Sequence, residues 1–279
     1  RSISSAGLSF IYVTFDWSTE IFRARQMVSE RLSAMEEGLP EDVIPRMGPI
    51  SSIMGEIMQI AIPIDTAKIS PMQVREYADW VLRPRLMAIP GIAQVIPIGG
   101  EVRQFQVQPD TRRMAELGIA LEQMEAAIRG FSSNTSGGFL ELTGREYLIR
   151  NLGRTSSLED LKNLAITARD GQPILLRQIA AVTFAPALRR GDAGFEGKPA
   201  VILGIQKQPT ADTIHLTRSI EAALDEMKKS LPAGMEAPQV TFRQASFIEA
   251  SIGTLQGKLI GASVFVAAIL FFFLGTLRP

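Results

Sequence analysis

The chain has 279 residues, 46% of them hydrophobic and 21% charged, which is enough for two or more globular units and one membrane span. Its 29 basic residues balance its 29 acidic residues, so nothing indicates the basic surface that nucleic acid requires, and we expect no nucleic-acid partner. The absence of cysteine excludes cysteine-based metal clusters and nucleophiles, and the single histidine, His215, leaves little room for a zinc site or a Ser-His-Asp triad.

The first hundred residues alternate between strand and helix patterns. Residues 7–15 alternate in polarity and are rich in β-formers, whereas residues 19–37 carry an apolar stripe at helical spacing. Asp16 or Ser18 is the expected cap of this helix, and Pro71 stands near the favoured first position of the next one. We expect strands at 7–15, 55–64, 93–98 and 102–107 and helices at 19–37 and 71–87.

The following residues contain shorter elements. Gly118 ends a short helical pattern, and Thr143-Gly144 and Asp170-Gly171 are typical of turns between paired strands. We expect helices at 111–117, 121–129, 158–164 and 213–231 and strands at 139–142, 147–151, 165–167, 174–176, 179–184, 200–205 and 239–242.

Two distant segments share one pattern. Ile21–Met47 contains Arg-Leu-Ser-Ala-Met-Glu-Glu-Gly-Leu-Pro, and Ile214–Val240 contains Ala-Leu-Asp-Glu-Met-Lys-Lys-Ser-Leu-Pro. Each resembles a strand, a long amphipathic helix, Leu-Pro and a strand, so one βαβ unit is used twice, unless two amphipathic helices are alike by chance. This pattern favours an α+β fold of ferredoxin-like split βαβ domains, with the β-rich middle, 103–193, inserted between two halves of one domain.

Near its end the chain has an uncharged apolar run, Leu259 to Leu277, between Lys258 and Arg278. About 19 residues at ~1.5 Å each span the ~30 Å hydrocarbon core of a bilayer. We therefore predict a transmembrane helix in contact with lipid, and a buried helix of a soluble domain is the alternative. Because the chain opens directly before a strand and stops just after this run, we expect a fragment of a longer membrane protein.

Five local sequences together carry a family resemblance. They are Met47–Ile57, Ile89–Gly100, Arg145–Arg154, Phe195–Pro199 and Phe273–Arg278. In this order and at these spacings the chain resembles the resistance–nodulation–division efflux transporters, in particular the heavy-metal branch that exports cobalt, zinc, cadmium, copper or silver. The resemblance covers essentially the whole chain, although Ser52 and Ile53 stand where the family pattern has Thr-Gly.

The resemblance implies a division of the chain into subdomains. Residues 1–52 would be the later part of the first porter subdomain, and 53–102 and 194–250 would be the two halves of the second. Residues 103–193 would be the docking subdomain, and 259–277 the transmembrane helix.

The resemblance also implies a function. The chain would be the periplasmic porter and docking portion of a proton-driven pump in the bacterial inner membrane, a secondary transporter and not an enzyme. The whole pump would be a homotrimer that passes cargo through a periplasmic adaptor to an outer-membrane channel. The family's proton-carrying acidic residues lie on a later membrane helix that this chain lacks. We expect no cofactor; a metal cation would be cargo.

One predicted strand carries an unusual set of side chains. Met54, Glu56 and Met58 alternate along 55–64, so we expect them on one face of the strand. Carboxylates suit hard or borderline cations, and thioethers suit Cu(I) or Ag(I). Because Glu56 matches the family's Gly-Glu beside the porter cleft, we predict a metal site completed by residues outside the chain. The alternative is that the methionines are core and Glu56 meets solvent or a basic partner.

A glycine-rich loop is the predicted contact to other subunits. Asn134, Gly137, Gly138 and Gly144 would shape a docking hairpin that meets a neighbouring subunit or the channel. The drug-exporting branch is an alternative that the Met47–Ile57 segment and the short docking loop disfavour. A stand-alone membrane-anchored binding or assembly module is a second alternative. An enzyme has the least support, because no nucleophile–base pair, metal cluster or phosphate loop is visible.

Overall fold

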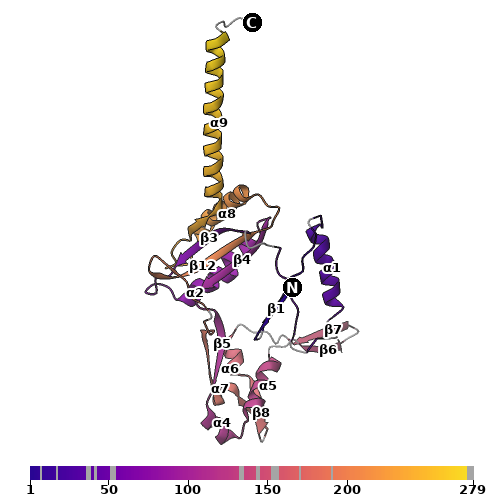
Figure 1. Cartoon of the computed structure of the whole chain (residues 1–279). Coiled ribbons are helices and arrows are strands. Elements are labelled where there is room, and N and C mark those ends of the chain that lie inside the picture. The colour runs from indigo at the N-terminus through magenta and orange to yellow at the C-terminus, as the bar shows by residue number, and fades with distance from the viewer. Residues whose placement is uncertain are drawn as a thin grey trace. The chain divides into compact units, whose positions relative to one another are not determined.

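The computed structural model describes residues 1–6, 8–16, 18–35, 39–40, 43–50, 55–131, 135–142, 145–151, 157–169, 171–189 and 191–274 (Figure 1). They belong to two units, Arg1–Ile50 and Ser51–Pro279. Both hydrophobic clusters lie in the second unit. The mixture of helices and strands that the sequence predicts is confirmed.

The first unit begins with a two-stranded hairpin. Strands β1 (Ser2–Ser5) and β2 (Leu8–Ile11) pair in antiparallel fashion. The strand predicted at 7–15 is therefore present as the shorter β2, whereas β1 was not predicted. Large apolar side chains here, among them Ile3 and Phe10, are exposed, and within the described part of this unit only Ala24 is a buried hydrophobic residue.

Helix α1 (Ile21–Ser33) completes the described elements of this unit. It begins after Glu20, whose carboxylate accepts hydrogen bonds from the backbone N–H groups of Phe22 and Arg23 at 2.9 and 2.8 Å. The cap is therefore Glu20, not either residue predicted from the sequence. A negative carboxylate at this position also interacts favourably with the positive end of the helix dipole.

The second unit is built on a five-stranded antiparallel sheet. Strand β12 (Lys198–Lys207) lies between β4 (Ile92–Gly99) and β3 (Glu56–Pro63), and β13 (Gln239–Arg243) pairs with the other side of β3. The short β11 (Gly194–Phe195) pairs with the start of β12. Strands from two segments far apart in the sequence therefore share one sheet.

Helices cover one face of this sheet (Figure 1). They are α2 (Pro71–Tyr77), the π-helical η3 (Ala78–Leu82), α3 (Arg83–Met87) and α8 (Thr213–Met227). The 3-10 turn η4 (Lys228–Ser230) follows α8. A capping box between Ser70 and Gln73 starts α2. The buried apolar core between helices and sheet includes Ile60, Ile62, Val74, Leu82, Leu86, Leu203, Ile205, Ile220 and Leu224.

Between the two halves of the sheet the chain forms a second cluster of elements with its own buried core, in which Leu176 and Ile179 are fully buried. Gly118, at φ +62°, ends the first helix of this cluster, as the sequence predicts. The elements are the strand pairs β5 (Arg103–Pro109) with β10 (Ala180–Pro186) and β8 (Ala165–Arg169) with β9 (Gln172–Leu175), and the helices α4 (Thr111–Leu117), α5 (Leu121–Phe131), α6 (Leu158–Lys162) and α7 (Leu176–Ile179).

A separate hairpin pairs β6 (Thr135–Leu142) with β7 (Arg145–Asn151). Its register shifts between Ser136 and Phe139, so one additional residue is accommodated at Gly137–Gly138. Glycine is the residue that such a bulge tolerates most easily.

The last element is α9 (Gln244–Leu274), a continuous helix of 31 residues (Figure 1). It is the one helix in the described residues that is long and apolar enough to cross a membrane, and none of its most apolar stretch is buried within the protein. The helix begins at Gln244, 15 residues before Leu259, where the predicted membrane span begins. The predicted end of the span, Leu277, lies outside the described residues.

The predicted internal repeat is seen in part. Helix α8 is followed by β13, as the sequence predicts. No strand follows α1 in residues 43–50. Both segments contain the expected helix, but the complete strand–helix–strand pattern is present only in the later segment of the described chain.

Candidate functional site

The predicted metal ligand Glu56 stands at the start of β3, where the strand is irregular. Glu56 lies opposite Gln206 and Met58 opposite Ile205, so Ile57 is an additional residue on the β3 side. Such a β-bulge interrupts the two-residue alternation of side chains. The carboxylate Oε1 of Glu56 accepts a hydrogen bond of 2.7 Å from Nε2 of Gln59, a residue three positions away that regular alternation would place on the opposite face.

The space beside the Glu56 carboxylate is provided by Gly204 of the neighbouring strand. A Cβ atom at Gly204 would lie 3.4 Å from Oε1 of Glu56. Gly204 and Gln59 are directly opposite each other in the sheet. Glu56 therefore belongs to the face formed by Gln59 and Gly204, away from the helices.

Met58 points the other way. It is 0% exposed and belongs to the core that the helices cover. The prediction that Glu56 and Met58 share one face is therefore wrong, because the bulge at Ile57 shifts the alternation. Met58 fits the alternative interpretation, a methionine that fills the core. Met54 lies outside the described residues.

What remains at this position is a small oxygen-donor site. Glu56 offers a carboxylate, and Gln59, which donates through its nitrogen, keeps its amide oxygen available. Carboxylate and amide oxygens suit hard cations better than soft ones. Within the described residues no group of three or more His, Asp or Glu side chains is placed to hold a metal ion, so Glu56 is at most one part of a site.

The predicted docking residues are described in part. Gly137 and Gly138 lie at the bulge of β6, whereas Asn134 and Gly144 are outside the described residues.

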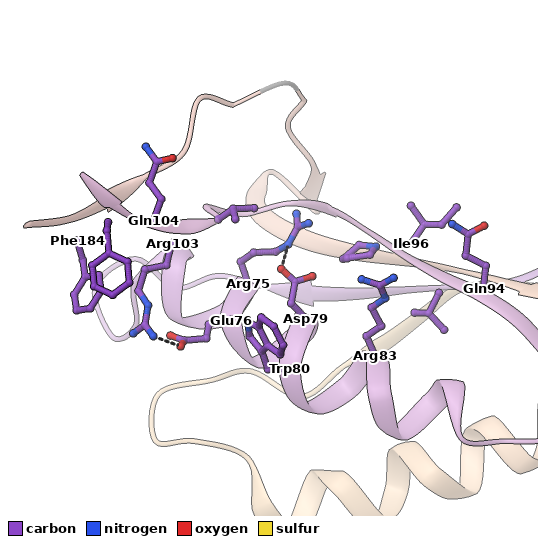
Figure 2. A pocket seen from close by; sticks show the side chains of 14 residues that line it. Arg75, Glu76, Asp79, Trp80, Arg83, Gln94, Ile96, Arg103, Gln104 and Phe184 are labelled. Carbon is purple, nitrogen blue, oxygen red and sulfur yellow. Dashed lines mark hydrogen bonds and ion pairs between the residues drawn. The ribbon is translucent and has the colours of Figure 1, made fainter. Parts of the chain in front are cut away.

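A cleft that sequence reasoning missed lies beside the edge of the main sheet (Figure 2). Its volume is about 720 Å³. One wall is formed by four consecutive residues of β4, 94–97, and the other by the helical face of Arg75, Asp79 and Arg83. The start of β5 and Phe184 of β10 close one end.

Charged side chains line this cleft in fixed geometry (Figure 2). Nε of Arg75 lies 2.8 Å from Asp79 Oδ2, and its Nη1 donates to the carbonyl of Gly99 at 2.6 Å. Arg103 contacts Glu76 at 2.7 Å and stacks 4.7 Å from the ring centre of Phe184. The Arg-Asp spacing of four residues is visible in the sequence, but nothing there indicates which strand faces it.

The helical wall of the cleft is irregular. Residues Ala78–Leu82 form a π-helical turn, in which the N–H of Arg83 bonds the carbonyl of Ala78 five residues back. Pro84 follows and has no N–H to continue the regular ladder. Trp80 within this turn is 77% exposed. Turns of this kind occur frequently at functional sites.

A second charged cluster joins the sheet to α9. Arg243, the last residue of β13, bonds Glu221 of α8 at 2.7 Å and Glu249 of α9 at 2.6 Å. These two carboxylates raise the pKa of Arg243 above its usual value, with Glu249 the larger cause. Arg218 adds a longer contact of 3.7 Å to Glu249. Because Ala245 in the first turn of α9 is also fully buried, the start of the helix is fixed to the sheet.

Comparison with known proteins covers the whole chain. The AcrB/AcrD/AcrF family description matches residues 1–279. The chain is 32% identical over 285 residues to the cobalt-zinc-cadmium resistance protein CzcA of Cupriavidus metallidurans and 31% identical over 280 residues to the cation efflux system protein CusA of Escherichia coli. Each alignment includes 100% of this chain and 27% of the relative, so the chain spans about a quarter of the length of these proteins.

The fold is also that of a solved structure. The X-ray structure of a heavy metal efflux pump, crystal form II, matches with a TM-score of 0.78 over 95% of this chain and 26% of the pump chain. The sequence identity in that alignment is 22%, so the likeness speaks for the fold alone.

Proposed function

The chain belongs to the AcrB/AcrD/AcrF family, and from this membership we propose that it forms the periplasmic porter and docking portion of a proton-driven inner-membrane pump for heavy-metal cations. The observation that carries the proposal is the family match over all 279 residues, with relatives named for cobalt, zinc and cadmium resistance and for cation efflux. The resemblance to the heavy-metal branch, predicted from five short motifs, is confirmed by these relatives.

The subdomain limits form part of the proposal. Residues 53–102 and 194–250 would be two halves of one ferredoxin-like porter subdomain, which the shared sheet of β3, β4, β12 and β13 supports. Residues 103–193, with their separate hydrophobic core, would be the docking subdomain. Residues 1–52 would be the later part of another porter subdomain, whose exposed apolar side chains require a covering partner.

In this proposal Glu56 is one ligand on the path of the cation. Its carboxylate lies on the sheet face that the helices leave open, with the amide oxygen of Gln59, which has no other partner among the described residues. Oxygen donors favour divalent cations such as Zn²⁺ or Co²⁺ over Cu(I). Met58 has no part in the site because it is enclosed in the core. The other ligands would come from beyond residues 1–279.

The assembly belongs to the same proposal. The whole pump would be a homotrimer that works with a periplasmic adaptor and an outer-membrane channel, and α9 would contact lipid along its apolar run. The β6–β7 hairpin, with its bulge at Gly137 and Gly138, would meet a neighbouring subunit or the channel. Protons would be carried by acidic residues outside this chain.

A chimeric pump tests the proposal. Residues 1–279 would replace the matching 27% of CzcA, and the chimera would be expressed in a host without its own metal exporter. We expect growth in Zn²⁺, Co²⁺ or Cd²⁺ to rise above that of the empty vector. A chimera present in the membrane at normal level that gives no tolerance to any of these ions, or to Cu⁺ or Ag⁺, would contradict the proposed cargo.

The role of Glu56 is tested in the same chimera. Glu56→Gln removes the charge and keeps the shape, so metal tolerance should fall while the protein level in the membrane stays the same. Glu226→Gln is the matched control, because among the described residues this carboxylate makes only an exposed ion pair, with Arg85. Unchanged tolerance with Glu56→Gln would remove Glu56 from the cation path and leave the pump assignment standing.

A further inference from the structure

The edge strand β4 has one free side in the described structure. It pairs with β12 and with no other described strand. Its eight residues, Ile-Ala-Gln-Val-Ile-Pro-Ile-Gly, carry no charge. An edge of this length without lysine or another protecting charge is a template for pairing with a further strand. Pro97, the single interruption, is a residue that sheets tolerate at an edge.

The cleft lies along this edge strand and is bounded on its other side by a helix. Residues 94–97 of β4 supply one wall, and Arg75, Asp79 and Arg83 line the facing helical wall at intervals of four residues (Figure 2). A groove between an edge strand and a helix is the arrangement by which several domains bind an extended peptide as an added strand. Backbone hydrogen bonds supply affinity in this mode, and side-chain pockets supply specificity.

The charge of the cleft indicates what kind of segment fits. Arg75 is paired with Asp79, and Arg103 with Glu76. Arg83 has no carboxylate partner within the described residues, so the five charged groups of the cleft leave one positive charge unpaired. A carboxylate can bond a guanidinium with two parallel hydrogen bonds, which no neutral side chain matches.

The cleft also offers apolar contact. Trp80, on the π-helical turn, is 77% exposed, and the tilted rings of Phe105 and Phe184 lie with their centres 5.0 Å apart at the end closed by β5 and β10. Exposed aromatic and arginine side chains in a cleft are the usual anchors of protein interfaces.

We propose that this cleft binds an extended segment of a partner protein that adds to β4 as a further strand and places a carboxylate on Arg83. The segment presents an acidic side chain to the helical wall and an apolar side chain to Trp80. This interaction does not depend on metal transport, so its test is independent of the function proposed above.

The test uses the full chain in mild detergent and a labelled probe peptide. The probe is a capped heptapeptide, Thr-Thr-Val-Glu-Val-Thr-Thr, and its binding is followed by fluorescence anisotropy. We expect saturable binding that weakens about tenfold when the central Glu of the peptide is replaced by Lys, since a charged hydrogen-bonded pair contributes about 1.5 kcal/mol or more. The Arg83→Glu variant should reverse this preference, whereas Arg23→Glu, at an exposed helical arginine of α1, should leave it unchanged.

A second probe separates strand addition from simple charge attraction. N-methylation of alternate backbone nitrogens keeps every side chain and removes the donors that pair with a strand edge, so binding should be lost. Equal binding of the methylated peptide, or no binding of either peptide, would overturn the proposal. Self-association of the chain that Arg83→Glu abolishes would also overturn it, because the occupant would then be a second copy.

Discussion

Replacing Arg243 should weaken the attachment of α9 to the sheet and lower the free energy of unfolding. The guanidinium bonds Glu221 of α8 and Glu249 of α9 at 2.7 and 2.6 Å, so Arg243→Gln removes both ion pairs and leaves two carboxylates near each other. The charged groups are partly enclosed, with the Arg243 side chain 23% exposed and each carboxylate side chain 36%. Hydrogen bonds between charged groups contribute about 1.5–3 kcal/mol when enclosed, and exposed pairs about 0–1 kcal/mol.

This partial exposure places the expected loss between the two limits. We expect Arg243→Gln to lower the free energy of unfolding by about 2 kcal/mol. The measurement is denaturant unfolding of the full chain in detergent, followed by circular dichroism. Arg218→Gln is the matched control, because Arg218 reaches the same Glu249 at 3.7 Å from a side chain that is 70% exposed. That change should cost at most about 0.5 kcal/mol.

A double-mutant cycle separates the pair from its surroundings. Residues that share a hydrogen-bonded ion pair show coupling energies of about 0.5–3 kcal/mol. We expect about 1 kcal/mol for Arg243→Gln combined with Glu249→Gln, since the loss of one carboxylate relieves part of the repulsion that the first change creates. A coupling energy of about zero, or equal losses for Arg243→Gln and Arg218→Gln, would refute the account of this joint.

Three further substitutions test other features. Tyr77→Phe should stabilise the fold by about 1 kcal/mol in denaturant unfolding, because the Tyr77 hydroxyl is buried without a partner in the described structure. Burial also raises the pKa of the Tyr77 hydroxyl, so above pH 10 the unfolded chain ionises first and the native chain loses stability. Tyr77→Phe should lose less stability over the same pH range, and equal alkaline losses would contradict this. Gly99→Ala should lower the free energy of unfolding by more than the ~1 kcal/mol expected for Gly171→Ala. Both glycines have positive φ, but only at Gly99 would the new Cβ lie 2.4 Å from a backbone oxygen. Equal shifts of the melting temperature for the two variants would refute the clash. Met58→Ala should cost about 2–5 kcal/mol as a core cavity, whereas Glu56→Gln should change stability by less than about 1 kcal/mol.

The elements that local sequence determines were predicted well. Helix α4 occupies Thr111–Leu117 as predicted, because a capping Asp110 and a left-handed Gly118 fix both ends within the segment itself. The start of α9 was missed by 15 residues, since Gln244–Lys258 contains two glycines, Gly253 and Gly257, and is too polar to stand out in a search for apolar runs. Its first turn is held by tertiary contacts of Ala245 and Arg243, which no local pattern reveals.

The candidate sites were less accessible to sequence reasoning. The Glu56 prediction named the right strand and the wrong companion, because the bulge at Ile57 depends on how β12 pairs with β3. The cleft joins residues of α2, β4 and β10, which lie up to about a hundred positions apart, so only the folded chain brings them together. Arginine and acid four residues apart are common on exposed helices and gave no reason to single out Arg75 and Asp79.

Helix α9 follows β13 directly, and the ion pairs of Arg243 fix its first turn to the sheet. A rotation of the sheet therefore also rotates the whole helix about its first turn. A helix of 31 residues is about 46 Å long at ~1.5 Å per residue. A tilt of about 10° at its first turn therefore displaces its last turn by about 8 Å, given that length. A small rotation of the sheet, which leaves the packing of the sheet unchanged, thus moves the last turn of α9 sideways. The movement is close to the diameter of a neighbouring helix, which is about 10 Å.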